Sequence, residues 1–262
     1  MKICLSSLEQ VGTKTNDGHD FIDTIKSKKI PIKWVLVSYL YASKGKGREN
    51  AERLRDSCEE MLVDSGAHTF RHGSKKDFLQ YTKEYAEFIK EFDKPNVIGY
   101  FEMDIDNVIG YEEVKKLRKE LEKVTDKIVP VWHYNRGIAE FENMCKEYTG
   151  KLVAITGFAG AEIKDNQYIM FCKIARKYNC KIHCLGMTRK KVLDTTPFDY
   201  VDSSSWKQTM IYGKPYNTNQ KKLKFARSTG DNDENIRQTL YCYSKGVEMQ
   251  KKYYNKWKKI CS

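Results

Sequence analysis

The sequence predicts a parallel (β/α)8 TIM barrel, in which eight strands alternate with helices and close into one sheet. Eight short apolar runs lie within the first 202 residues, and helical patterns separate most of the later ones. The chain has 262 residues, and single barrels of this class commonly have about 250. We therefore expect one domain over 1–262, with strands up to about 206 and a basic helical region over 207–262. A doubly wound open sheet is the alternative fold.

The strand predictions depend on short apolar runs that begin or end at polar or turn-forming residues. The run at 32–41 is entered through Pro31, and the run at 198–202 follows Pro197. The eight strands are predicted at 3–8, 32–41, 61–64, 97–103, 127–133, 152–158, 181–187 and 198–202.

The helix predictions depend on apolar residues at helical spacing. Residues 75–92 carry an aromatic stripe, which we interpret as core packing, and Pro95 follows it. Residues 10–28 are polar and irregular, and Lys44-Gly-Lys-Gly-Arg48 is predicted to be a flexible basic loop. Helices are predicted at 49–60, 75–92, 111–123, 136–148, 165–179, 188–194 and 232–259.

The composition favours a polyanionic partner. Lys and Arg number 47 against 35 Asp and Glu, a formal net charge of +12, and a compact domain this basic most often binds nucleic acid. A Lys-rich surface that is merely solvated is the alternative.

The chain starts without the apolar run of a signal peptide, and its eight cysteines contain no paired CxxC set. We therefore expect a reducing cytoplasm and free thiols.

Polar and acidic residues stand where the predicted strands end. Asp64, Asp104, His133 and Asp202 each follow an apolar run, and the working residues of a barrel lie at these carboxyl ends. Neighbouring carboxylates are costly to ionise together, so one of them is expected to have a raised pKa and to serve as an acid. The alternative is that each Asp only caps the following helix.

Short motifs accompany these strand ends. They are Met61-Leu-Val-Asp-Ser-Gly-Ala67, Phe101-Glu-Met-Asp104, Ala154-Ile-Thr-Gly-Phe-Ala159, His183-Cys-Leu-Gly-Met187 and Val201-Asp-Ser-Ser-Ser-Trp206. In this order they resemble the tRNA-guanine transglycosylase superfamily, and most closely its phage members that insert 7-deazaguanine bases into DNA. Val129-Pro-Val-Trp-His133 stands where that family has a strand ending in Gln-Gly. The resemblance extends over about residues 60–206.

The resemblance implies a pentosyltransferase that exchanges guanine in DNA for a base such as preQ0. Asp202 would attack C1′ and form a covalent glycosyl-enzyme. Asp64 would act as general acid and base, Asp104 would bind the polar edge of the base, and the backbone of Gly157 would contact its exocyclic oxygen. Further substrate contacts are expected from Ser65, Gly66, His133, Phe158, Gly186, Met187 and Ser203. The cellular setting implied is a bacterium or a phage-infected bacterial host.

One alignment remains open in the motif around the nucleophile. Bacterial tRNA enzymes of this superfamily read Phe-Asp-Cys-Val, which would align the nucleophile with Asp199. Asp199 starts the predicted strand and so lies at the bottom of the barrel, where residues serve stability. It also differs in parity from Asp202, so the two cannot face the same side of one regular strand. We therefore predict Asp202 as the nucleophile.

The chain departs from the tRNA enzymes after the last strand. Beyond Trp206 it has two cysteines and no histidine, too few ligands for the structural zinc site of that family, and it has no added RNA-binding domain. Both departures favour DNA over tRNA. Neither a metal nor a cofactor is predicted, and His183 and the neighbouring cysteines are interpreted as core residues.

Phosphate contacts are predicted for Lys44, Lys46, Arg48, Arg71, Lys75, Arg189, Lys190 and Lys207.

Other functions remain compatible with these patterns. The same base exchange could act on tRNA. An N-glycosidase would hydrolyse the nucleoside without a second base. A non-catalytic nucleic-acid-binding barrel would tolerate replacement of all three acids.

Overall fold

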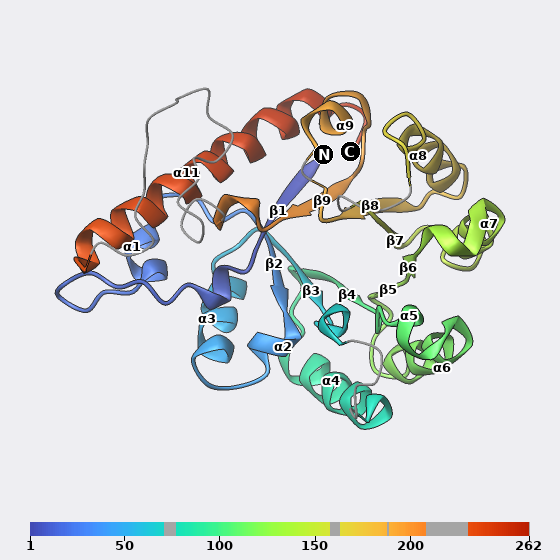
Figure 1. Ribbon diagram of the computed structural model, residues 1–262, viewed down its shortest axis with the longest axis horizontal. Helices are drawn as coiled ribbons and strands as arrows, with labels where there is room; N and C mark the ends of the chain where they lie inside the picture. Colours follow the sequence, from blue (N-terminus) through green and yellow to red (C-terminus); the bar gives the residue numbers. More distant parts are fainter. Residues whose placement is uncertain (71–76, 158–162, 188, 208–229, 262) are drawn as a thin grey trace.

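A computed structural model describes residues 1–70, 77–157, 163–187, 189–207 and 230–261. Its strands form one parallel sheet in the order β5-β4-β3-β2-β1-β9-β8-β7-β6, which curves into a nearly closed barrel surrounded by helices (Figure 1). The predicted barrel is therefore confirmed. The strands are β1 (Lys2–Ser6), β2 (Trp34–Ser38), β3 (Glu60–Asp64), β4 (Val97–Phe101), β5 (Ile128–Val129), β6 (Val131–Trp132), β7 (Leu152–Thr156), β8 (Lys181–Leu185) and β9 (Tyr200–Ser203).

The fifth predicted strand is split at Pro130. Its first half, β5, pairs with β4, and its second half, β6, pairs with β7. Proline has no N–H to donate to a neighbouring strand, but the carbonyl of Pro130 accepts a hydrogen bond from the Ala154 amide at 2.9 Å. The two halves thus join the two ends of the sheet, and the nine strands correspond to the eight predicted ones.

Helices follow most strands and cover the outside of the barrel. In α4 the predicted aromatic stripe is buried against the barrel, as expected for core packing. The helices are α1 (Phe21–Ser27), α2 (Tyr39–Ala42), α3 (Gly45–Arg55), α4 (Phe78–Phe92), α5 (Asp106–Ile109), α6 (Tyr111–Glu122), α7 (Gly137–Glu147), α8 (Tyr168–Lys177), α9 (Lys190–Thr195) and α11 (Asn232–Trp257). Short 3-10 helices are η1 (Leu8–Gln10), η2 (Ala67–Thr69), η3 (Tyr134–Arg136) and η4 (Ser205–Lys207). None of the described helices has both the length and the hydrophobicity that a bilayer span requires.

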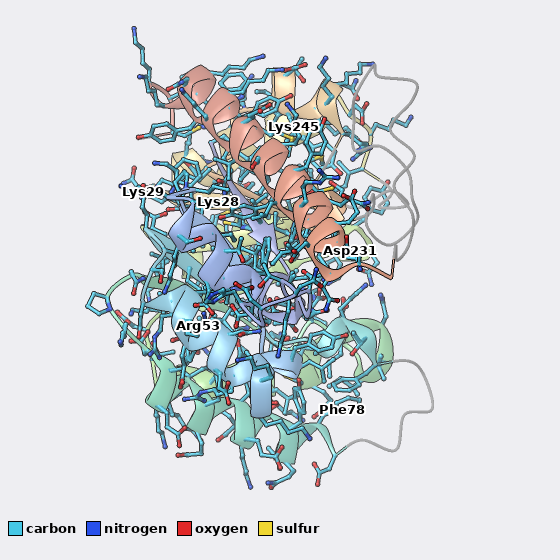
Figure 2. The ribbon with its side chains drawn as sticks, turned by 90° about the vertical axis from the view of Figure 1, so that its left-hand side faces the viewer. Lys28, Lys29, Arg53, Phe78, Asp231 and Lys245 are labelled. Atoms are coloured by element: carbon cyan, nitrogen blue, oxygen red, sulfur yellow. The ribbon has the colours of Figure 1, made fainter. Side chains whose placement is uncertain are left out.

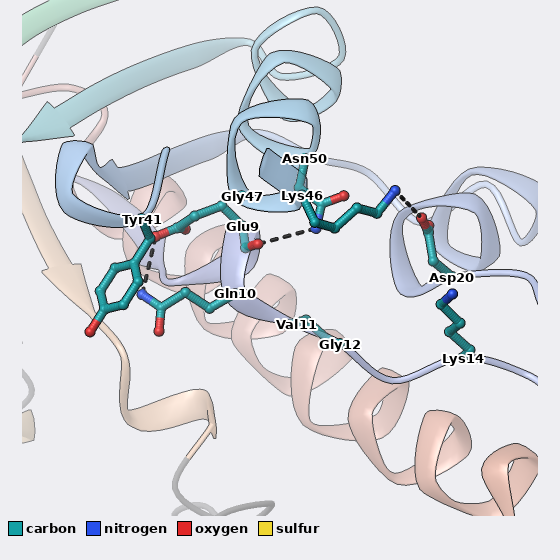
Figure 3. Close-up of a pocket in the computed structure, with 10 residues that line it drawn as sticks. All are labelled: Glu9, Gln10, Val11, Gly12, Lys14, Asp20, Tyr41, Lys46, Gly47 and Asn50. Carbon is teal, nitrogen blue, oxygen red and sulfur yellow. Dashed lines mark hydrogen bonds and ion pairs between the residues drawn. The ribbon is translucent and has the colours of Figure 1, made fainter. Parts of the chain in front are cut away.

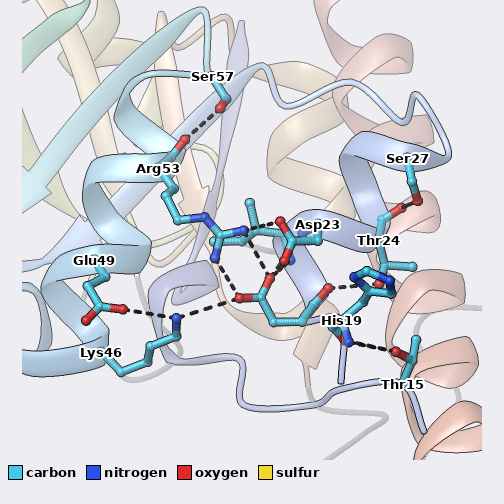
Figure 4. Close-up of polar contacts among 11 residues, drawn as sticks. Thr15, His19, Asp23, Thr24, Ser27, Lys46, Glu49, Arg53 and Ser57 are labelled. Carbon is cyan, nitrogen blue, oxygen red and sulfur yellow. Dashed lines mark hydrogen bonds and ion pairs between the residues drawn. The ribbon is translucent and has the colours of Figure 1, made fainter. Parts of the chain in front are cut away.

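Two N-terminal predictions are wrong. The segment 44–48 belongs largely to the first turns of α3, and α1 lies within the stretch predicted to be irregular. The side chain of Asp20 caps α1 by accepting from the amides of Ile22 and Asp23, and it pairs with Arg53 at 2.6 Å. Arg53 also pairs with Asp23 of the same helix (Figure 4). Burial acts to raise the pKa of Asp20, but the hydrogen bond and charge of Arg53 outweigh it and lower that pKa to about 2. This tertiary ion pair stabilises a short helix that has little periodic signal.

The long helix α11 packs along β1 and lies beside α1 (Figure 2). Gly246 lets it approach closely, because a Cβ there would lie 3.0 Å from the Leu5 side chain. Gln250 donates to the carbonyls of Ile3 and Trp34 at 2.7 and 3.0 Å. Near its end, the Trp257 indole donates to the carbonyl of Leu193 at 3.0 Å. Aromatic residues of the basic C-terminal segment therefore pack against the barrel.

The barrel interior is a packed core. Cys4, Leu36, Leu62, Phe101 and Ala154 belong to one buried cluster of strand residues inside the sheet. Alternate strand residues face outward, where they join the larger clusters beneath the helices. Because the interior is filled, a ligand site is expected at the carboxyl ends of the strands, as in other barrels of this class.

Candidate active site

A pocket of about 370 Å³ lies at the carboxyl ends of the strands. It contains Asp64, the last residue of β3, and Asp202, the third residue of β9. Asp104 and His133 enter it just after β4 and β6. The complete lining is Leu36, Asp64, His68, Asp104, Asn107, His133, Thr156, Leu185, Gly186, Asp202 and Ser204. The structure thus brings together all three predicted acids, with His133 and Gly186.

The carboxylate of Asp202 is held by three hydrogen-bond donors. Its Oδ1 faces Nε2 of His183 at 3.0 Å and accepts from the Gly186 amide at 2.8 Å. Its Oδ2 accepts from the hydroxyl of Ser6 at 3.1 Å. The donors come from β8, the turn after it and β1, the neighbours of β9 in the sheet. The main-chain pairing of the barrel therefore fixes this side chain.

Asp64 has a different environment. Its Oδ2 accepts from the Gly66 amide at 2.9 Å, and the hydroxyl of Ser38 lies 3.5 Å away. Burial, together with the charges of Asp104 and Asp202, raises the pKa of Asp64 to about 7. This acid is therefore poised to take up and release a proton near neutral pH.

Gly66 makes the turn after β3 possible. Its φ of 72° is left-handed, and an added Cβ would lie 2.5 Å from Cβ of Leu40. Only glycine avoids both costs. Gly66 is predicted to contact a substrate. In this structure its amide donates a hydrogen bond to Oδ2 of Asp64.

Asp104 and His133 form a pair at the other side of the pocket. Nε2 of His133 makes a short hydrogen bond to Oδ1 of Asp104 and lies 3.5 Å from Oδ1 of Asp106. Burial opposes both charges. The hydrogen bond and charge of the partner outweigh burial, so the pKa of His133 is raised and that of Asp104 is lowered. The contact therefore favours the charged form of each partner.

The same residues form a geometric candidate for a metal site. One ligand atom each from Asp104, Asp106 and His133 lies within 4.8 Å of the others. Asp106, however, already pairs with Arg136 at 2.9 Å, and Asp104 pairs with His133. Both carboxylates thus already have partners within the protein, the guanidinium of Arg136 and the ring of His133.

Several residues predicted to touch a substrate have contacts within the protein. The Gly157 amide donates to the carbonyl of Leu185 at 2.8 Å, so it is not available to a base in this conformation. Ser65 is buried and donates to the carbonyl of Glu102 at 2.9 Å. Met187 is buried in the outer core. Ser203 is also buried, and its hydroxyl accepts from the amide of Ser205 at 3.1 Å, which shapes the turn. Phe158 lies outside the described residues.

Some of the residues predicted to contact phosphates form ion pairs or hydrogen bonds within the protein, and others are exposed. Arg48 pairs with Glu52 at 2.6 Å and packs over the ring of Phe88. Arg189 pairs with Asp165 at 2.7 Å. Lys207 donates to the carbonyl of Ser7 at 3.3 Å, and burial lowers its pKa. Lys44 and Lys190 are exposed, whereas Arg71 and Lys75 lie outside the described residues.

Lys46 lines a second pocket, of about 480 Å³, between η1 and the start of α3 (Figure 3). Its amine lies 3.0 Å from Glu49, a pair drawn in Figure 4, and 3.8 Å from Asp20, a pair drawn in Figure 3. None of the predicted acids Asp64, Asp104 or Asp202 lines this pocket. We therefore assign the chemistry to the smaller pocket at the strand ends.

Sequence reasoning missed part of the site. His183 was interpreted as a core residue, which is correct for its burial, but its ring also contacts Asp202. Thr156, Asn107 and Ser204 line the pocket as well. Strand spacing offered a signal for His183, because residues two apart in a strand face the same side. Leu185 lies two residues after His183 and ends β8 at the pocket.

The comparisons with known proteins give no relative. No family model matches the chain, and neither a curated protein nor a solved structure is significantly similar to it.

Proposed function

We propose that the protein exchanges guanine in DNA for a 7-deazaguanine base such as preQ0, through a covalent aspartyl-glycosyl intermediate. The observation that carries the proposal is the contrast between two acids in one pocket. Asp64 has a pKa raised to about 7, while three hydrogen-bond donors surround Asp202. Pairs of carboxyl groups in contrasting environments are typical of acid and nucleophile assignments at sugars.

In the proposed reaction, Asp202 attacks C1′ of the target nucleotide as the bond from C1′ to N9 breaks. Asp64 donates its proton to the departing guanine. The incoming base then loses its N9 proton to Asp64 and attacks C1′, which releases Asp202 as a carboxylate. Both steps invert the anomeric carbon, so the product retains the original configuration.

The pair of Asp104 and His133 supports recognition of a guanine-like base. Asp104 lines the pocket and carries a lowered pKa, so it presents acceptor oxygens. The N1–H and the exocyclic amine of a guanine-like base are donors that match them. Because C1′ chemistry needs the nucleotide out of the helical stack, the substrate would be flipped out or single-stranded.

The choice of DNA comes from the sequence. The net charge of +12 favours a polyanion, and the sequence motifs resemble most closely those of the members that insert bases into DNA. The same exchange on tRNA is the second candidate, because the proposed chemistry needs only guanine and the C1′ carbon of its pentose, which both nucleic acids contain.

The decisive experiment supplies guanine-containing DNA and tRNA separately with preQ0, followed by nucleoside mass spectrometry. We expect a 7-deazaguanine nucleoside in DNA and stoichiometric release of guanine. Incorporation only into tRNA would move the substrate assignment. Guanine release without preQ0 would indicate an N-glycosidase. Unchanged DNA and tRNA, with binding that survives replacement of all three acids, would indicate a non-catalytic barrel.

A further inference from the structure

His183 is the most deeply buried polar group that contacts the pocket acids. Its side chain is fully buried inside the barrel, and its ring meets that of Phe101 edge-on at 5.0 Å. Nε2 lies 3.0 Å from Oδ1 of Asp202. Among the described residues, Nδ1 is buried and has no hydrogen-bond partner. The proposed reaction gives this histidine no role of its own.

These contacts determine the tautomer of His183. A carboxylate only accepts hydrogen bonds, so the proton of the ring belongs on Nε2. A second proton on Nδ1 would bury an N–H without an acceptor, in apolar surroundings, which costs more than a bare lone pair. His183 therefore donates to Asp202 through Nε2, whereas Nε2 of His133 lies near two carboxylates.

The donors also distinguish the two oxygens of Asp202. Oδ1 is held by His183 and by the main-chain amide of Gly186, two donors whose positions are set by β8 and the turn that follows it. Oδ2 has the Ser6 hydroxyl, whose proton can rotate away about the C–O bond. A nucleophilic oxygen needs a free lone pair aimed at C1′, and only Oδ2 can free one without disrupting the sheet.

Resting on the proposed function, we infer that His183 is a positioning residue that fixes Oδ1 of Asp202, so that Oδ2 is the oxygen that bonds to C1′. In the attack, a lone pair of Oδ2 forms the ester bond to C1′. The electron pair of the C1′–N9 bond leaves with guanine, which receives the Asp64 proton. In the second step the ester electrons return to Oδ2. Ser6 releases Oδ2 in the first step and donates to it again in the second.

Two substitutions at position 183 separate positioning from packing. His183→Gln keeps an N–H donor near the place of Nε2, whereas His183→Leu fills the space without a donor. We expect His183→Leu to lower the rate of covalent adduct formation about 100-fold, the effect of a misplaced reacting group, with KM for DNA little changed. His183→Gln should recover most of that loss. Ser6→Ala should still form the adduct within about 10-fold of the wild-type rate, since it removes only one neutral donor.

Two structural measurements complete the test. Nitrogen-15 NMR of the wild-type protein should show His183 as the Nε2–H tautomer, with a shift in Asp202→Ala. A crystal structure of the trapped adduct should show C1′ on Oδ2 and an intact contact from His183 to Oδ1. An adduct on Oδ1, an Nδ1–H tautomer, or a fully active His183→Leu overturns the inference while base exchange itself stands. Failure of the wild-type protein to exchange any base removes the proposed function and the role of Oδ2, whatever tautomer NMR finds.

Discussion

The indole Nε1 of Trp206 donates a hydrogen bond to the carbonyl oxygen of Ser6 at 2.9 Å. This bond joins η4, which follows β9, to the last residue of β1, and the hydroxyl of Ser6 contacts Asp202. Trp206 is fully buried, near Phe21 and edge-on to Tyr243. It packs beneath the strand ends, so it is not free to stack on a base.

Trp206→Phe should therefore lower the free energy of unfolding by about 1–3 kcal/mol, because it leaves the Ser6 carbonyl buried without its donor. Trp206→Ala should cost about 3–5 kcal/mol, since it also leaves a cavity. Urea unfolding followed by circular dichroism measures both. Trp257→Phe is the matched control, because it removes another indole bond to a carbonyl, far from the pocket. Its pocket chemistry should be unchanged, and equal stability of Trp206→Phe and wild type would contradict the assignment.

The barrel and its three strand-end acids followed from local signals. Apolar runs located the strands, and parity distinguished Asp202 from Asp199. The donors to Asp202 depend on pairing in space, which local patterns do not contain: β8 beside β9 brings His183 to it, and β1 beside β9 brings Ser6. The helix α1 was missed for the same reason, since its capping residue Asp20 is stabilised by Arg53 of α3.

The raised pKa of Asp64 predicts a pH dependence of the first half-reaction. Protonated Asp64 helps guanine leave, so adduct formation should fall as pH rises through about 7. Rapid-quench trapping with guanine-containing DNA across pH 5.5–8.5, roughly 1.5 units either side of that value, measures this. Asp64→Asn should be slow at every pH and lose the titration. A wild-type rate that is flat across this range would exclude Asp64 as the acid.

The same shift affects stability in a defined direction. In the folded protein, the pKa of Asp64 lies above 3.8, the ordinary value for this side chain. Folding therefore favours the protonated form, and this contribution to stability is lost as pH rises from about 4 to about 7. Asp64→Asn should be less sensitive to pH than wild type over that interval in urea titrations. Glu102, whose pKa burial also raises to about 7, leaves a residual slope in both proteins, so the difference between them is the diagnostic quantity.

The Asp104–His133 pair predicts a second titration. Asp104→Asn removes the hydrogen-bonded charge that raises the pKa of His133, so that pKa should fall. Proton NMR of the His133 ring measures the change. Asp165→Asn is the control, because Asp165 pairs with Arg189 rather than with His133. An unchanged His133 titration in Asp104→Asn would show that Asp106 supplies the stabilising charge instead.

Exposed lysines at the strand-end face should give DNA binding a strong salt dependence. Each phosphate contact contributes about 0.9 to the slope of log K against log salt concentration. Lys44→Gln with Lys190→Gln should therefore reduce that slope by about 2 if both lysines bind phosphates. Fluorescence anisotropy with double-stranded DNA measures it. Lys177→Gln is the control, because Lys177 pairs with Glu142 on the outer helices. A slope that none of these changes alters would place the DNA elsewhere.

Substitutions of Asp199 and Asp202, the two acids around the last strand, should have different effects on stability and on adduct formation. Oδ2 of Asp199 accepts from the Ile182 amide at 2.8 Å, and the Asp199 carbonyl accepts from the Lys2 amide. Asp199→Ala leaves the Ile182 amide without its acceptor and should cost about 1–3 kcal/mol of stability. Because these contacts lie at the start of β9, away from the pocket, the Asp199→Ala protein should still form the adduct.

Asp202→Asn keeps the shape of the side chain, so this variant should fold normally but form no adduct. Denaturing gel electrophoresis of protein incubated with labelled DNA shows the adduct directly. An adduct formed by Asp202→Asn but not by Asp199→Ala would assign the nucleophile to Asp199, at the opposite end of the barrel.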